Sequence, residues 1–342
     1  MVEIKKEGII LRKTNLSFEN EGILNPAVIK ENNKIHLFYR AVAKGNFSTV
    51  GHCILSDPLT IEKRSDSPII VPESEYEKHG TEDPRIVKID DLFYITYTSY
   101  DGINALGTLK TSKDLKSWKN EGIIVPKISY EEFKFLSELE GLIPEKYKRY
   151  NEFQLSHTDS DPIFLWDKNL IFFPRKINDK FYFLHRIRPD IQIVSVKNIE
   201  DLNFDFWQDY FSHFKDHILL SPKYNHESSY IGGGCPPIET EYGWLMIYHG
   251  VYDTVNGYVY NACAALLSIE NPEKEISRLP YPLFKPEKEW ELKGEVNNVC
   301  FPTGTIVEND RLYIYYGAAD ERIAVASVSI SKLLKELMMY AV

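Results

Sequence analysis

The chain has 342 residues, of which 43% are hydrophobic, 26% charged and 13% aromatic, and its formal net charge is −10. These proportions are typical of a water-soluble globular protein. The negative charge argues against a general binder of nucleic acid or of anionic membranes, so neither partner is expected.

The first residues, 1–7, have no apolar run typical of a secretory leader, and no later apolar run reaches about 18 residues. The four cysteines are widely spaced and form no Cys-x-x-Cys pair, which indicates buried thiols in a reducing compartment. A cytoplasmic location is therefore expected, although a leader already removed would leave the same sequence. Neither a metal nor a cofactor is expected, because no residues show metal-ligand spacing.

One pattern occurs five times: a proline, a short apolar stretch, a polar turn and an aromatic-rich stretch. The copies begin at Pro26, Pro84, Pro174, Pro237 and Pro302. Each copy predicts a β-hairpin, because turns such as Asp90-Asp91 favour tight reversals, and an alternating third strand follows each hairpin. Five such units predict an all-β fold, a five-bladed β-propeller in a single domain over residues 1–342. A two-sheet sandwich is the alternative, but it does not explain five copies.

Three stretches depart from the repeat. Residues 127–160 predict a helical insertion, with Ser129 as the N-cap of a helix over 130–139. A shorter, aromatic and charged insertion spans 204–226, and a short helix is expected over 330–339. The longer insertion could cover a site or form an oligomer contact, so the sequence leaves a homo-oligomer open.

The stretch GTEDPR at residues 80–85 contains the first candidate catalytic residue, Asp83. Pro84 fixes its own φ and favours extended geometry for Asp83, which would hold this carboxylate at the start of a strand. A rigidly placed acid suits a proton donor. The alternative is a loop acid that pairs with Arg85 or caps a turn.

The repeat predicts that residues far apart in sequence meet at one rim. In a propeller, residues before the repeat prolines gather there with residues that end the next strand. These positions include the polar residues Asn25, Arg40, Asp83, His185, Arg186, His249 and Asp320. A core face would not collect them, because unpaired buried charges are costly.

Such a set suits cleavage of a glycosidic bond, in which one acid protonates the leaving oxygen. If water is the nucleophile, a second carboxylate must activate it, and Glu227 is a candidate; a surface-loop acid is its alternative interpretation. If phosphate is the nucleophile, a basic pocket replaces that carboxylate.

Four stretches carry a resemblance to a known family: TEDPR, FYRAV, IGGGCPPIETEYGWLMIYHGV and FPTGTIVENDRLYIYYGAAD. Together they resemble glycoside hydrolase family 130 over roughly residues 20–330. The resemblance implies a five-bladed propeller enzyme that acts on β-mannosides. It would be either an inverting phosphorylase that releases mannose 1-phosphate or an inverting hydrolase.

The resemblance also implies roles for individual residues. Asp83 would be the general acid, and in the phosphorylases its proton is thought to pass through a mannosyl hydroxyl. Asp320 matches a mannose-contacting acid. The other residues expected to bind sugar or phosphate are Asn25, Arg40, Arg85, Asn104, Lys168, Arg186 and His249.

Two departures from the family pattern affect this assignment. Asn104 falls where the phosphorylases carry an Arg-Asn pair, and here that arginine is absent. The usual His-Arg-Pro is interrupted by Ile187 and Arg188.

Three hypotheses follow. The first is a β-mannoside phosphorylase with inorganic phosphate as co-substrate, which the basic residues favour. The second is a β-mannoside hydrolase, which the missing arginine and Glu227 favour. The third is a sugar-binding propeller without catalytic activity.

Overall fold

The computed structural model describes residues 1–149 and 163–341, and strands dominate them. All pairs of named strands are antiparallel except β4 with β6. The strands fall into five antiparallel groups, and four of the predicted proline-hairpin copies form hairpins at the predicted positions. The third copy differs, because its first strand ends at Phe172 and Pro174 lies in the connection to the second strand. The all-β prediction is therefore confirmed.

The first and second groups are joined into one sheet. The first contains β2 (Gly22–Glu31), β3 (Lys34–Ala43), β4 (Phe47–Asp57) and β5 (Thr60–Arg64). The second contains β6 (Gly80–Ile89), β7 (Leu92–Tyr100), β8 (Ala105–Ser112) and β9 (Lys119–Ile123). A single parallel pairing, Ser48 with Gly80, joins them. Only glycine fits there, because its φ is +140° and a Cβ would lie 2.7 Å from the Ser48 nitrogen.

The remaining three groups form separate sheets. The third contains β10 (Lys168–Phe172), β11 (Phe181–Arg186), β12 (Ile191–Val196) and β13 (Ile218–Leu220). The fourth contains β14 (Tyr230–Gly233), β15 (Ile238–Thr240), β16 (Gly243–Thr254), β17 (Gly257–Leu267) and β18 (Glu275–Arg278). The fifth contains β19 (Cys300–Glu308), β20 (Arg311–Ala318), β21 (Arg322–Ser329) and β1 (Lys5–Leu11), so both ends of the chain share a sheet.

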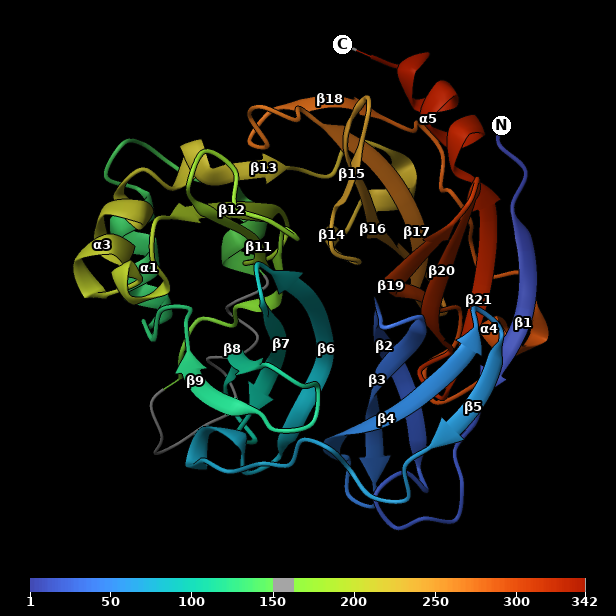
Figure 1. Ribbon diagram of the computed structural model, residues 1–342. Coiled ribbons are helices and arrows are strands. Elements are labelled where there is room, and N and C mark those ends of the chain that lie inside the picture. Colours follow the sequence, from blue (N-terminus) through green and yellow to red (C-terminus); the bar gives the residue numbers. More distant parts are fainter. Residues whose placement is uncertain (150–162, 342) are drawn as a thin grey trace.

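Figure 1 shows the five groups arranged around a common centre. The inner strand β2 contacts both β6 and β19, and β10 contacts both β6 and β14. Hydrogen bonding links the described strands into four sheets rather than five, because of the Ser48–Gly80 pairing. The closed five-bladed arrangement therefore stays a prediction.

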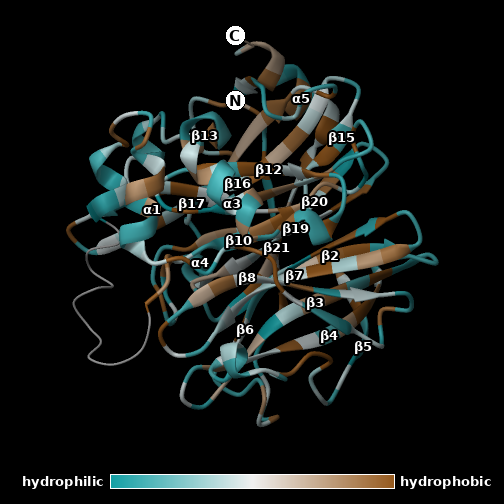
Figure 2. Cartoon of the chain, turned by 90° about the vertical axis from the view of Figure 1, so that its left-hand side faces the viewer, coloured by the Kyte–Doolittle hydropathy of each residue, from teal (hydrophilic) through white to brown (hydrophobic). Residues whose placement is uncertain are grey.

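The hydrophobic core is divided among the junctions between neighbouring groups. Five clusters of buried side chains lie there, one between each successive pair of groups, including the fifth with the first. Figure 2 shows hydrophobic stretches along strands such as β2 and hydrophilic ones in the loops. Apolar packing thus holds the inner strand ends in fixed positions relative to one another.

The predicted helices are present in the described residues. The α-helices are α1 (Tyr130–Ser137), α3 (Phe204–Ser212), α4 (Glu289–Leu292) and α5 (Ile330–Met338). Short 3-10 turns are η1 (Glu75–Glu77), η2 (Ile199–Asp201), η3 (Phe214–His217) and η4 (Asn225–Glu227).

The two insertions pack against each other. Ser129 caps α1 as predicted, since its hydroxyl accepts the backbone N–H of Glu132. The rings of Phe133 in α1 and Phe211 in α3 lie 5.5 Å apart. Residues 150–160 of the predicted insertion lie outside the described residues. No helix among the described residues is long and apolar enough to cross a membrane.

Candidate active site

The inner strands carry backbone irregularities at their central ends. The register of β2 with β3 shifts between Leu24 and Ala27, and that of β6 with β7 shifts between Glu82 and Arg85. Asn25 and Asp83 lie inside these shifts, with φ of +49° and +52°. The expectation of extended geometry for Asp83 was therefore wrong. Proline cannot donate to the ladder, so the strand bulges there and re-aims the preceding side chain.

The Asp83 carboxylate lies between a hydrogen-bond donor and a cation. The Asn25 Nδ2 donates to Asp83 Oδ1 over 2.7 Å, and the Arg40 Nη1 lies 3.6 Å from the same oxygen. Arg85 instead donates to the backbone carbonyls of Asp83 and Pro84. Arg85 thus stabilises the backbone of the bulge, while Asn25 and Arg40 orient the Asp83 carboxylate.

Glu82 joins two of the predicted cations. Its Oε1 lies 2.8 Å from Arg40 Nη2, and its Oε2 lies 3.3 Å from Lys168 Nζ. The Lys168 ammonium also lies 5.1 Å from the centre of the Trp166 ring. No role was predicted for Glu82 from the sequence, although this residue directly precedes Asp83.

Arg186 and Arg188 form a positively charged group near these carboxylates, here called the cationic wall. Arg186 Nη1 lies 3.2 Å from His249 Nε2. Burial, together with the charge of Arg186, holds the pKa of His249 well below its usual range, so its neutral ring accepts this hydrogen bond. Burial and the neighbouring charge of Arg188 also lower the pKa of Arg186 to about 10. The Arg188 guanidinium lies 4.3 Å from the centre of the Tyr230 ring.

These groups line a cavity of about 170 Å³. Its lining residues are Asn25, Arg40, Asp83, Lys168, Asn169, Arg186, Arg188, Tyr230, Tyr260, Val299, Phe301 and Asp320. Six predicted site residues are among them. His249 does not line the cavity but is hydrogen-bonded to Arg186, which does. A larger cavity of about 470 Å³ shares Arg40 and Asp320 with it and is also lined by the exposed residues Asn46 and Glu295. An apolar cavity between α1 and α3 contains none of these residues.

The two carboxyl groups of the cavity differ in acidity. Burial alone would raise the pKa of Asp83, but Arg40, Arg85 and Lys168 hold it below its usual value. Burial and the negative charge of Asp83 raise the pKa of Asp320 to about 6. Carboxyl groups with separated pKa values suit acid–base chemistry.

The raised pKa of Asp320 predicts a pH-dependent stability. Between pH 3.8 and about 6 the folded state keeps a proton that the unfolded state has released. Asp320 therefore contributes stability at low pH that is lost as the pH rises through about 6. The free energy of unfolding of Asp320→Asn minus that of wild type should therefore increase as the pH rises from about 4 to about 7, because only wild type loses this contribution. Urea unfolding across this range measures the difference, and a constant difference would contradict the prediction.

Asn104 does not line the cavity, which corrects its predicted binding role. Its Oδ1 accepts the backbone N–H of Phe164 over 2.7 Å, and its Nδ2 donates to Asp101 Oδ2 over 3.2 Å. Asn104 therefore holds a loop in place.

Glu227 does not reach the cavity either, and its predicted role in activating water is corrected. It is fully buried. One oxygen accepts the Tyr248 hydroxyl, and the other accepts the backbone N–H of Lys223 and pairs with Arg278 at 3.4 Å. All these contacts are structural.

The same arrangement occurs in two other groups. Glu77 accepts the Tyr97 hydroxyl, and Glu291 accepts the Tyr316 hydroxyl over 2.5 Å. Glu77 also accepts the backbone N–H groups of Glu73 and Ser74. Glu291 likewise accepts those of Glu287 and Lys288. In all three cases a proline stands five residues before the glutamate: Pro72, Pro222 and Pro286. This repeated spacing is the sequence signal that could have identified Glu227 as structural.

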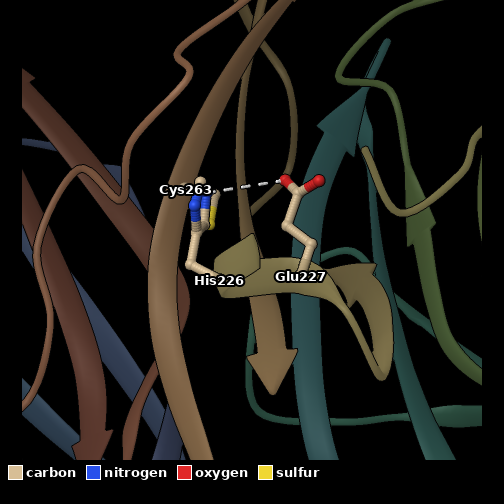
Figure 3. Close-up of side chains that lie close together, drawn as sticks. All are labelled: His226, Glu227 and Cys263. Carbon is tan, nitrogen blue, oxygen red and sulfur yellow. Dashed lines mark ion pairs between the residues drawn. The ribbon is translucent and has the colours of Figure 1, made fainter. Parts of the chain in front are cut away.

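Figure 3 shows Glu227 beside His226 and Cys263. Their candidate ligand atoms lie within 4.8 Å of one another, close enough to share a metal ion. However, both Glu227 oxygens are already occupied by hydrogen-bond donors, and burial raises the pKa of the Cys263 thiol well above its usual value. The arrangement therefore gives no argument for a bound metal.

Two carboxyl groups of different acidity in one cavity are the kind of pair that enzymes cleaving glycosidic bonds use. The chain belongs to glycoside hydrolase family 130, a family of carbohydrate-active enzymes. The family model, described as beta-1,4-mannooligosaccharide phosphorylase, matches residues 7–166 and 150–339. The family predicted from the sequence is confirmed.

Two relatives come from Thermoanaerobacter sp. (strain X514). The chain is 34% identical over 333 residues to its beta-1,2-mannobiose phosphorylase, covering 92% of this chain and 93% of the relative. It is 32% identical over 342 residues to its 1,2-beta-oligomannan phosphorylase, covering 95% and 97%. The fold is similar to that of beta-1,2-mannobiose phosphorylase from Listeria innocua in complex with beta-1,2-mannobiose. That match has a TM-score of 0.73 and 22% identity, and it covers 98% of this chain and 99% of that one.

Proposed function

We propose that the protein is an inverting β-mannoside phosphorylase, with Asp83 as general acid and inorganic phosphate as the nucleophile. The observation that carries this proposal is the cavity in which Asp83 and Asp320 share one space with Lys168, Arg186 and Arg188. The phosphorylase activities named for the two Thermoanaerobacter relatives support it.

Two buried donors at the cavity support an anionic ligand. Among the residues that the structure describes, the Arg186 Nε and the Asn169 Nδ2 have no hydrogen-bond partner, although Arg186 and Asn169 are only 6% and 5% exposed. An unpaired buried donor costs roughly 1–3 kcal/mol, so an acceptor bound at this wall would be favoured. Phosphate oxygens are strong acceptors for such donors.

The same charges explain how Asp83 could serve as an acid. In the free protein, the cations around it hold its pKa below the usual value, so it is ionised at neutral pH. A phosphate dianion bound beside Lys168 would offset this positive charge and raise the proton affinity of Asp83. Asp83 would then deliver the proton, directly or through a mannosyl hydroxyl, to the leaving oxygen as phosphate attacks the anomeric carbon from the opposite face.

A hydrolase is the second candidate. A solved structure with a TM-score of 0.73 and 22% identity is described by the words "The GH130 family of mannoside phosphorylases contains glycoside hydrolases that target beta-1,2 mannosidic linkages in Candida mannan". Asp320, rather than Glu227, is the carboxyl group in the cavity that could activate water. The cationic wall favours the phosphorylase, because activation of water requires no such wall.

Three broader features belong to the same proposal. The contacts of β2 with β6 and β19, and of β10 with β6 and β14, support five blades in one propeller domain over residues 1–342. A cytoplasmic site suits phosphorolysis, which conserves the energy of the glycosidic bond inside a cell. Phosphate is proposed as co-substrate without a further cofactor, and a homo-oligomer remains open.

The proposed function predicts phosphate-dependent turnover. Incubation with β-1,2-mannobiose should release mannose and mannose 1-phosphate in equal amounts when inorganic phosphate is present. Inversion makes the α anomer the expected phosphate ester, which NMR identifies. Equal release of mannose without phosphate would indicate the hydrolase, whereas binding of mannobiose without turnover under either condition would indicate a sugar-binding protein.

A further inference from the structure

We propose that Arg188 is a phosphate-contacting residue of this site and determines its specificity for phosphate over water. This inference rests on the proposed function and concerns a residue of the segment that interrupts the usual His-Arg-Pro pattern. The observations that carry it are its place in the cavity lining, the rigid turn that presents it, and the charges around it.

The turn between β11 and β12 positions Arg188. The preceding residue, Ile187, is only 1% exposed and belongs to the cluster between the second and third groups. Its backbone N–H donates to Gln192 Oε1 over 2.7 Å, and its carbonyl accepts Gln192 Nε2 over 2.9 Å. Ile187 is therefore fixed in the core, while Arg188 lines the cavity.

Two tyrosines support the guanidinium. The Cζ atom of Arg188 lies 4.3 Å from the centre of the Tyr230 ring, and that of Arg186 lies 5.6 Å from the same centre. The Tyr230 and Tyr260 hydroxyls lie 2.5 Å apart, which fixes this ring pair. This contact holds the guanidinium beside the cavity, and a guanidinium can bind phosphate oxygens in pairs.

The neighbouring positive charges of Arg186 and Arg188 favour a bound anion. Arg186 and Arg188 lie close enough that the charge of Arg188 lowers the pKa of both Arg186 and His249. Within the described parts of the chain, no carboxylate lies within 4.0 Å of Arg186 as an ion-pair partner. The Glu82 carboxylate pairs with Arg40 and Lys168 instead. Two neighbouring arginines repel each other, and a bound dianion would remove that repulsion.

Charged groups from all sides of the cavity are compatible with this assignment. Lys168 and Asn169 from β10 face the same space, as do Asp83 from β6 and Asp320 from the turn after β20. A sugar ring placed against the carboxyl groups would leave the wall with Arg186 and Arg188 for phosphate.

Arg188→Ala tests the inference. The phosphate KM should rise roughly 10- to 100-fold, as expected for loss of a charged hydrogen bond to a ligand, whereas the mannobiose KM should change less than about threefold. Arg188→Lys should fall between wild type and Arg188→Ala, because it keeps the charge but loses paired donation and stacking. The matched control is Arg175→Ala. Arg175 also stacks on a ring, that of Trp244, but it is 44% exposed and lies outside the cavity.

A phosphate KM within about twofold of wild type in Arg188→Ala would overturn the inference, and so would a rise confined to the mannobiose KM. If wild type shows no phosphate-dependent turnover, the proposed function itself fails, and calorimetric titration with inorganic phosphate still decides the role of Arg188. Binding to wild type that is lost in Arg188→Ala would support the inference. Equal binding to both proteins, or none to wild type, would overturn it.

Discussion

Asp83→Asn is expected to lower kcat for mannobiose phosphorolysis by roughly 10²- to 10⁴-fold, the usual contribution of a general acid. Asparagine has nearly the same shape and tolerates the left-handed backbone at φ +52°, so the fold should persist. The Asn25 and Arg40 contacts show that this carboxylate is oriented towards the cavity rather than paired within a turn. Steady-state kinetics at saturating phosphate and mannobiose measure the loss.

The leaving group offers a sharper test of the same role. A substrate whose leaving group departs without a proton, such as an aryl mannoside with a nitrophenol, needs no general acid. Asp83→Asn should therefore lose much less activity on that substrate than on mannobiose. An equal loss on both substrates would indicate that Asp83 positions the sugar instead of donating a proton.

Asp90→Asn is the matched control. Asp90 follows the other end of β6, is exposed, and has a similar φ of +54°. The same atoms change at a similar backbone geometry, but outside the cavity. Unchanged kinetics in Asp90→Asn, with a large loss in Asp83→Asn, would assign the effect to the site. Asp83→Asn activity within about tenfold of wild type would contradict the general-acid role.

The largest expected effect on stability follows removal of Glu227. Glu227→Ala should lower the free energy of unfolding by about 3 kcal/mol or more, because its buried partners lose their acceptor. Those partners are the Tyr248 hydroxyl, the backbone N–H of Lys223 and, in part, Arg278, which keeps its pair with Glu275. The kcat per folded molecule should stay close to that of wild type. Urea unfolding and active-site-normalised kinetics measure both quantities.

Two matched variants separate this structural role from catalysis. Glu77→Ala removes the equivalent residue of the second group and should destabilise the protein in the same way. Glu241→Ala removes an exposed acid from a turn of the fourth group and should change stability by less than about 0.5 kcal/mol. A Glu227→Ala protein with normal stability and lost kcat would restore Glu227 as a catalytic carboxylate.

The sequence by itself was sufficient for the all-β class, four of the five predicted hairpins, the helices at 130 and 330, and the family. These features depend on local patterns: alternation, turn residues, a capping serine and conspicuous motifs. The register of the repeat also placed Asn25, Arg40, Asp83, Arg186 and Asp320 together, because similar units repeat the same strand ends. His185, which the register placed with them, is instead buried against Asp167 and Tyr210.

Only the tertiary structure decided which polar residues face that centre. Asn104 and Glu227 have the chemistry of site residues, yet loop and turn backbone atoms use their hydrogen-bonding capacity. In the sequence, Arg188 belongs to the segment that interrupts the family pattern. In the structure it lines the cavity, because the preceding residue, Ile187, is fixed in the core. The left-handed backbone of Asp83 likewise depends on strand pairing with β7. Burial, charge neighbours and hydrogen-bond partners come from residues distant in sequence, so local patterns do not determine them.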